Sequence, residues 1–297
     1  MGTPEFAVAS LDALVQAGCT IVGVITAPDK PAGRGMKLNE SAVKKYAVEK
    51  GLHILQPVKL KDPQFIGELK ALKADLQVVV AFRMLPEIVW NMPPMGTINV
   101  HGSLLPQYRG AAPINWAVIN GEKETGVTTF KLQHEIDTGN ILLQEKFSIG
   151  EDETAGEVHD RMKEIGAKLL VKTVEGLAQG SLKEIPQTVS ADTKHAPKIF
   201  TETCKINWHQ PAAAIHNLIR GLSPYPGAFT YLNDKMLKIF KSKKEITAHQ
   251  QQPGDIDTDK KNYLKFACSD GYIHILELQL EGKKKMPVEE FLKGYRF

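Results

Sequence analysis

Apolar residues follow two different patterns along the first half of the chain. Apolar or β-rich runs, typical of strands buried in a parallel sheet, lie at residues 21–25, 76–81 and 97–101. Segments with apolar residues at helical spacing separate these runs, at residues 5–17, 41–50 and 63–72. Strands that alternate with helices predict an α/β fold with a Rossmann-like, mostly parallel sheet.

The first predicted helix directly follows the turn Met1-Gly2-Thr3-Pro4. A doubly wound sheet begins with a strand whose carboxyl end leads into the first glycine-containing turn. We therefore hypothesise that the sequence is truncated and that a short apolar strand belongs just upstream of Met1. An apolar, β-rich segment encoded in frame before Met1 would support this hypothesis, and its absence from the native transcript would refute it.

The second half of the chain has different signals. Thr154 and Glu157 have the spacing of a capping box, which predicts a long helix that starts there and reaches about Gln179. Farther on, short β-rich segments are joined at Asn233-Asp234 and at Asp270-Gly271, and both pairs are hairpin signals. Several short strands at this spacing predict a small OB-like β-barrel.

These patterns divide the chain into a catalytic α/β domain at residues 1–190, a linker at 191–204 and a barrel domain at 205–297. The net charge is +3, but it is unevenly distributed. The part from Lys205 onward has 15 Lys+Arg against 10 Asp+Glu, and the remainder has 22 against 24. Although many surfaces are mildly basic without a function, a basic part beside a slightly acidic body is expected when one part catalyses and the other holds a polyanion.

Composition excludes several classes of protein. No run approaches the roughly 18 apolar residues of a membrane span, and no basic segment followed by an apolar stretch marks a secretory signal. The cysteines, Cys19, Cys204 and Cys268, are too few and too scattered for a disulfide framework or a metal cluster. The nine histidines lack the HExxH spacing. We expect a cytoplasmic protein with no metal and no membrane partner.

The end of the third apolar run carries the candidate chemistry. Asn99 and His101 are two residues apart, so both side chains leave the same face of an extended strand. An amide donor beside an imidazole suits a reaction in which a carbonyl becomes an oxyanion while a proton moves. Asp137, before a Thr-Gly turn, would orient the imidazole if the sheet brings it close. The alternative is a turn-forming Asn beside a partly buried His, with Asp137 as a turn cap.

The stretch from Gly96 to Pro113 resembles, almost residue for residue, the signature of the methionyl-tRNA formyltransferases, within the wider group of enzymes that use 10-formyltetrahydrofolate. The resemblance covers nearly the whole chain. It implies transfer of a formyl group to the amino group of methionine on initiator tRNA, for translation initiation. It also implies that Asn99, His101 and Asp137 form the catalytic triplet.

The same resemblance implies where the folate donor binds. The family's Ser-Leu-Leu-Pro segment helps to form the folate pocket. The end of the predicted strand at residues 76–81, with the segment after it, resembles the wall on the pterin side. That segment also reads as an ordinary core strand followed by a loop. The residues concerned are Ser103, Leu104, Leu105, Pro106, Phe82, Met84 and Leu85.

Basic residues in two places are expected to bind tRNA. The loop at residues 28–38 resembles the one with which the family grips the acceptor stem, and it contains Lys30, Arg34 and Lys37. A hairpin of the predicted barrel contains Lys241, Lys243 and Lys244. Contacts to phosphates would make the affinity depend on salt. Both segments also read as ordinary solvated surfaces.

The chain is expected to be a monomer. Three alternative functions remain open at the level of sequence. The first is formyl transfer to an amino sugar nucleotide, and the second is hydrolysis of 10-formyltetrahydrofolate to formate. The third is a catalytically silent RNA-binding protein. The loop and the basic barrel argue against the first two, and the intact triplet argues against the third.

Overall fold

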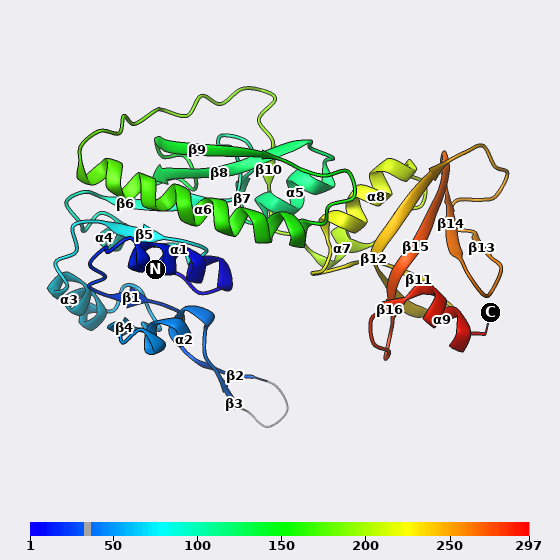
Figure 1. The fold of residues 1–297 in the computed structure, drawn as a ribbon, viewed down its shortest axis with the longest axis horizontal. Helices are drawn as coiled ribbons and strands as arrows, with labels where there is room; N and C mark the ends of the chain where they lie inside the picture. Colours follow the sequence, from blue (N-terminus) through cyan, green and yellow to red (C-terminus); the bar gives the residue numbers. More distant parts are fainter. Residues whose placement is uncertain (33–36, 297) are drawn as a thin grey trace. The chain divides into compact units, whose positions relative to one another are not determined.

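The computed structural model of this chain describes residues 1–32 and 37–296, which form two compact units. Unit 1 contains residues 1–109, 126–146 and 161–194, and unit 2 contains residues 110–125, 147–160 and 195–297. Figure 1 shows the path of the chain. Within the described ranges, none of the helices combines the length and the apolar character needed to cross a membrane.

Parallel strand pairs lie at the centre of unit 1. β1 (Val24–Ile25) pairs in parallel with β4 (Ile54–Leu55), and β5 (Gln77–Val79) with β6 (Thr97–His101). β6 also pairs, antiparallel, with β8 (Glu124–Lys131). β9 (Ile141–Ser148) follows in the order β5-β6-β8-β9, so this sheet is mixed.

Met1 and Gly2 lie between β1 and β5. The Gly2 N–H donates to the Ile25 carbonyl at 3.0 Å, and the Val80 N–H donates to the Met1 carbonyl at 2.9 Å. Only Val24 and Ile25 of the apolar run at residues 21–25 form a strand. The Met1 amine donates to the Val78 carbonyl, and burial lowers the pKa of this amine from 8.0 to about 5.

Helices and a hairpin complete unit 1. The capping box is confirmed, because the backbone N–H groups of Thr154 and Glu157 each bond to the side chain of the other residue, at 2.8 and 3.3 Å. The long helix α6 follows this cap, and its Thr173 hydroxyl lies 2.8 Å from that of Thr129 on β8. The helices are α1 (Glu5–Gln16), α2 (Ala42–Glu49), α3 (Pro63–Ala71), α4 (Glu87–Trp90) and, from residue 161 onward, α6 (Ala155–Ala178), whose cap and first turns belong to unit 2. The hairpin is β2 (Lys30–Ala32) with β3 (Lys37–Asn39).

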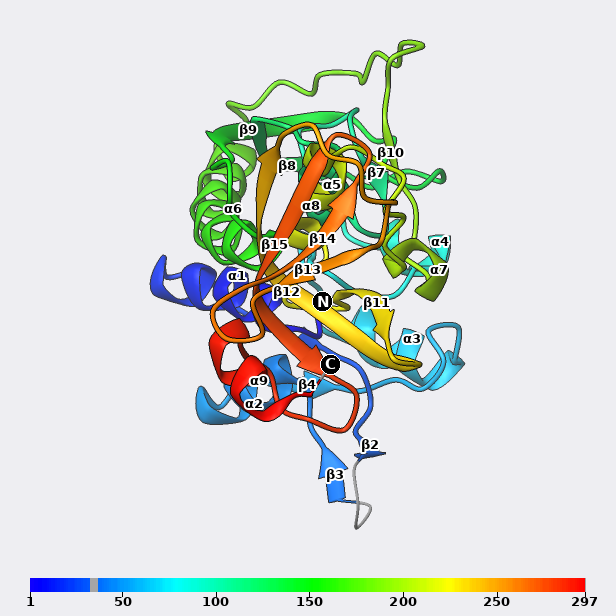
Figure 2. The ribbon, with the colours of Figure 1, turned by 90° about the vertical axis from the view of Figure 1, so that its right-hand side faces the viewer.

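An antiparallel sheet forms most of unit 2, and Figure 2 shows that it is curled into a half-barrel. Its strands are β11 (Ala228–Leu232), β12 (Lys235–Ile246), β13 (Ile256–Thr258), β14 (Leu264–Cys268), β15 (Gly271–Leu280) and β16 (Met286–Pro287). Both predicted hairpins are confirmed, β11–β12 and β14–β15. The pairing of β12 with β15 shifts register near Lys241, and such bulges increase strand twist.

The remaining elements of unit 2 are short. The helices are α5 (Pro113–Ile119), α7 (Thr201–Cys204), α8 (Ala212–Gly221) and α9 (Val288–Gly294), and the strand is β10 (His195–Ala196). The strand β7 (Arg109–Gly110) has Arg109 in unit 1 and Gly110 in unit 2. The side-chain amide of Asn115 on α5 donates to the Gly221 carbonyl at the end of α8, at 2.7 Å. Residues 191–204, predicted as a linker, contain β10 and α7.

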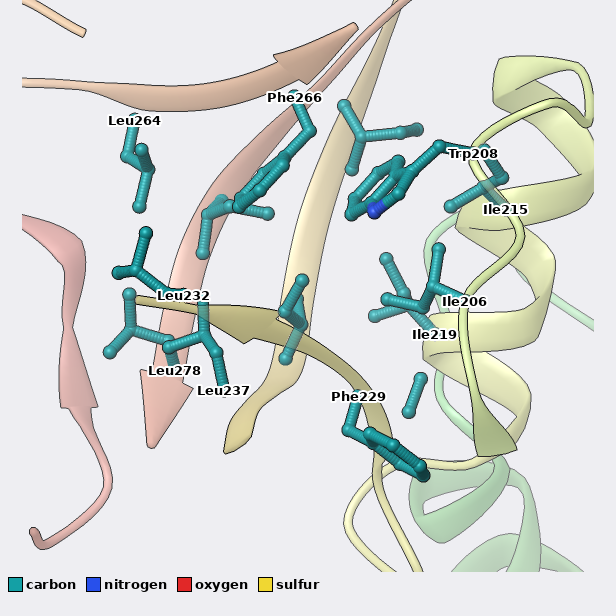
Figure 3. Close-up of a cluster of buried hydrophobic side chains, with 14 of the residues drawn as sticks. Ile206, Trp208, Ile215, Ile219, Phe229, Leu232, Leu237, Leu264, Phe266 and Leu278 are labelled. Atoms are coloured by element: carbon teal, nitrogen blue, oxygen red, sulfur yellow. The ribbon is translucent and has the colours of Figure 1, made fainter. Parts of the chain in front are cut away.

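Side chains from the half-barrel and from α8 form a continuous apolar core in unit 2 (Figure 3). Trp208 stacks on Phe266 with ring centroids 4.6 Å apart, and its indole N–H donates to the Thr230 hydroxyl. Leu237, Ile273 and Leu278 are fully buried. Because burial of apolar surface is the main favourable term in folding, we expect this cluster to dominate the stability of unit 2.

Two leucines on β15 provide a matched test of that core. Leu278 is fully buried, whereas Leu276 is 46% exposed. Leu278→Ala should lower the free energy of unfolding by about 2–5 kcal/mol because it removes methyl groups and leaves a cavity. Leu276→Ala should cost less than about 1 kcal/mol. Equilibrium urea denaturation measures both, and equal losses would contradict the assignment of the core.

Candidate active site

The strand β6 fixes the positions of Asn99 and His101. This strand is paired on both sides, with Asn99 opposite Val79 on β5 and opposite Phe130 on β8. The two side chains are two residues apart, so they leave the same face of the strand. A strand held by two neighbours leaves little freedom to its backbone, which suits residues whose side chains must be placed accurately.

The His101 imidazole is buried between two oxygen atoms. Its Nε2 lies 2.9 Å from the Tyr108 carbonyl, and its Nδ1 lies 3.8 Å from Asp137 Oδ2. A carbonyl can only accept, so Nε2 carries the proton and donates to Tyr108. In the neutral imidazole, Nδ1 is therefore the nitrogen that can take up a proton.

Tyr108 is held by the loop that follows β6. The Ser103 hydroxyl donates to the Gln107 carbonyl at 2.6 Å. Thr128 on β8 anchors the loop, because its hydroxyl donates to the Ser103 carbonyl and accepts from the Leu105 N–H. The Tyr108 backbone has a φ of 60°. This left-handed conformation helps to turn the Tyr108 carbonyl towards His101.

Asp137 reaches His101 from the turn between β8 and β9. Asp137 is 8% exposed, and its backbone is left-handed with a φ of 55°. A Cβ at Gly139 would lie 1.6 Å from the Lys131 carbonyl oxygen, so only glycine fits there. The sheet thus brings Asp137 beside His101, whereas the role of each residue stays a prediction.

Asn99 has an unpaired atom at this site. Its side chain is half-buried, and Oδ1 is fully buried without a hydrogen-bond partner among the residues that the structure describes. Burying an unpaired polar atom costs about 1–3 kcal/mol. A group that binds at the site and donates to Oδ1 would remove this penalty, and the amide nitrogen offers donors as well.

The residues expected at the folate pocket differ in exposure. Ser103 and Leu105 are buried, and Leu105 packs in a cluster with Phe130 and Ile141. Leu104 and Pro106 are half-buried. Phe82 and Leu85 are half-buried against a second cluster that contains Ile25 and Phe65, whereas Met84 is 73% exposed.

The residues expected to bind tRNA fall in both units. Lys30 on β2 is exposed, Lys37 begins β3, and Arg34 lies outside the described residues. On β12, Lys241 and Lys243 are exposed, whereas Lys244 pairs with Glu151 at 2.7 Å. Among residues 1–32 and 37–296, no three His, Cys, Asp or Glu side chains are grouped so that they could hold a metal ion.

Sequence reasoning missed two residues that reach this site. Arg109 belongs to the signature stretch but received no role, and Gln187 belongs to none of the motifs in the sequence. The Arg109 guanidinium donates to the Gln187 side chain, which in turn donates to the Asp137 carbonyl. The only signal in the sequence was the place of Arg109 in the signature stretch, and nothing marked Gln187.

Two family descriptions match most of the chain. The pattern described as formyl transferase matches residues 1–174, and the formyl transferase C-terminal domain matches residues 198–296. The chain is 53% identical to the methionyl-tRNA formyltransferase of Bacteroides fragilis, across 99% of this chain and 94% of that protein.

Two solved structures share the fold. WlaRD, a sugar 3N-formyl transferase solved in the presence of dTDP and 5-N-formyl-THF, superposes with a TM-score of 0.70 at 23% identity, over 95% of this chain and 97% of WlaRD. HypX from Aquifex aeolicus in complex with tetrahydrofolic acid superposes with a TM-score of 0.61 at 22% identity, over 83% of this chain. The match spans 44% of HypX.

Proposed function

Because the chain belongs to the formyl transferase family, we propose that it transfers the formyl group of 10-formyltetrahydrofolate to the amino group of methionine on initiator tRNA. The position of His101 between Tyr108 and Asp137 supports a reaction that needs proton transfer, such as formyl transfer. The similarity over nearly the full length to a methionyl-tRNA formyltransferase supports methionyl-tRNA as the acceptor.

The geometry of the triplet supports the roles proposed for it. The methionine amine attacks the formyl carbon, and its proton goes to Nδ1 of His101, beside Asp137. The Asn99 amide donates to the carbonyl oxygen as it becomes an oxyanion, and Oδ1 accepts from the attacking amine. The bond from the formyl carbon to N10 of the donor then breaks. The imidazolium returns its proton to that nitrogen.

The donor pocket is proposed on the same face of unit 1 as the triplet. Phe82, Met84 and Leu85 would line the side that takes the pterin ring, since these apolar residues follow β5 and retain exposed surface. Leu104 and Pro106 would lie against the donor. Ser103 and Leu105, which are buried, would shape the loop from behind.

The acceptor tRNA is proposed to contact both basic segments. Lys30, Arg34 and Lys37 would approach the acceptor stem, and Lys241, Lys243 and Lys244 would contact phosphates. Unit 2 would supply an OB-like barrel for this purpose within residues 205–297, after a catalytic domain at 1–190 and a connection at 191–204. We further propose that the protein acts as a cytoplasmic monomer.

The phosphate contacts can be tested by salt dependence. The double variant Lys241→Ala with Lys243→Ala should weaken tRNA binding, and the slope of log K against log salt should fall by roughly one to two. The matched control is Lys168→Ala with Lys172→Ala, two exposed lysines on α6. Filter binding at several salt concentrations measures both, and equal slopes in the two double variants would contradict the proposed contacts.

The acceptor can be tested with competing substrates. The protein is mixed with 10-formyltetrahydrofolate, charged initiator tRNA and an amino sugar nucleotide, and the products are identified by mass spectrometry. Formyl-methionyl-tRNA as the main product supports the proposal. Formylated sugar nucleotide would make it wrong in favour of a sugar formyltransferase, and free formate without either product would indicate a hydrolase.

A further inference from the structure

Gln187 differs from its neighbours in the segment between α6 and β10. Residues 183–186 and 188–190 are all exposed, whereas Gln187 is half-buried. A glutamine turned inward from an exposed segment must find partners for both ends of its amide, because unpaired polar groups are costly once they leave water.

All four hydrogen bonds of the Gln187 side chain are made within unit 1. Oε1 accepts from Arg109 Nε at 3.0 Å and from Arg109 Nη2 at 2.6 Å. Nε2 donates to the carbonyls of Asp137 at 2.9 Å and Gly139 at 2.7 Å. The amide thus joins the loop after β6 to the turn between β8 and β9.

These two segments hold the two polar neighbours of His101. Arg109 directly follows Tyr108, whose carbonyl accepts from Nε2, and Asp137 lies beside Nδ1. We propose that Gln187, with Arg109, is a positioning residue for formyl transfer that keeps Tyr108 and Asp137 in place on either side of His101. This inference rests on the proposed function.

The segment around Gln187 is itself fastened to the turn that carries Asp137. Ile185 and Ile141 exchange two backbone hydrogen bonds, of 2.8 and 2.9 Å. Glu184 pairs with Lys131 at 2.6 Å and accepts from Asn140, and these bonds lower the pKa of the Glu184 carboxyl. The backbone at Gln187 is therefore held in place, so its side chain can stabilise the left-handed backbone of Asp137.

The proposal predicts that an amide is required at position 187. In Gln187→Glu, the carboxylate can still accept from Arg109, but it cannot donate to the carbonyls of Asp137 and Gly139 and repels them. Gln187→Met has similar length and neither donates nor accepts. Gln179→Glu makes the same chemical change at an exposed position in unit 1 and serves as the control.

The closing experiment is a double-mutant cycle on kcat with methionyl-tRNA and 10-formyltetrahydrofolate, using Gln187→Glu, Asp137→Asn and both together. Gln187→Glu should lower kcat by about ten- to hundredfold, with KM for both substrates unchanged within about twofold. In the Asp137→Asn background it should lower kcat by no more than about threefold, because the group through which it acts is already impaired.

The outcomes distinguish this inference from the proposed formyl transfer on which it rests. A lower kcat in Asp137→Asn with wild-type kcat in Gln187→Glu would overturn only the role of Gln187. The same holds if the two single variants each lower kcat and the double variant lowers it by the product of the two factors. Wild-type kcat in Asp137→Asn would overturn the proposed role of Asp137 as well. If circular dichroism shows that Gln187→Glu does not fold, Gln187→Met takes its place in the cycle with the same expectations.

Discussion

Replacing His101 by alanine is expected to lower kcat for formyl transfer by about one hundred- to ten-thousandfold, the range typical of general acid–base catalysis. The proposed reason is geometric: with Nε2 bonded to the Tyr108 carbonyl, Nδ1 beside Asp137 is the nitrogen left to take the amine proton. Affinity for methionyl-tRNA should stay within about twofold, because no phosphate contact is removed. Steady-state kinetics and tRNA binding together measure this division.

The control for this prediction is His134→Ala, since the His134 side chain is 88% exposed and belongs to the same unit. It should leave kcat and tRNA affinity unchanged. An equal loss of tRNA affinity and of kcat in His101→Ala would contradict the assignment of His101 to the chemical step.

Replacing Asn99 by leucine, which has nearly the same shape, should lower kcat by about one hundred- to one thousandfold, the effect of removing an oxyanion donor. The stability of the fold should not suffer, because the substitution also removes a buried Oδ1 that has no partner among the described residues. A catalytic loss with an unchanged or higher melting temperature would be hard to explain by damage to the fold.

Asn91→Leu is the matched control for this substitution, since Asn91 is an exposed asparagine in the same unit. It should leave kcat unchanged. If Asn99→Leu keeps wild-type kcat, or if its loss follows a fall in melting temperature, the amide is not the oxyanion donor.

Local signals in the sequence were enough for much of the fold. The capping box at Thr154 and Glu157 and the hairpin at Asn233-Asp234 depend on neighbouring residues, and the structure contains both. The hairpin near Asp270 is also present, although Cys268 pairs with Gly271, so the turn lies one residue earlier than expected. Strand lengths depend on tertiary neighbours, which is why the run at 21–25 yields only Val24 and Ile25 as a strand.

The candidate site was only partly predictable for the same reason. The period of two places Asn99 and His101 on one face, whatever the rest of the fold does. The distance from Asp137 to His101 depends on the mixed sheet and on the left-handed backbone at Asp137. Gln187 could not be found, because an isolated polar residue in an exposed segment carries no pattern, and only the folded chain brings Arg109 to it.

The most direct test of this account follows the formyl group from donor to product. The protein is mixed with formyl-labelled 10-formyltetrahydrofolate and charged initiator methionyl-tRNA, with uncharged tRNA as the control, and label in formylmethionine and in free formate is counted. We predict that each formyl group lost from the donor appears on the methionine amine, and none on uncharged tRNA. Label that appears only as formate, or that stays on the donor while the protein is folded, would contradict formyl transfer to methionyl-tRNA.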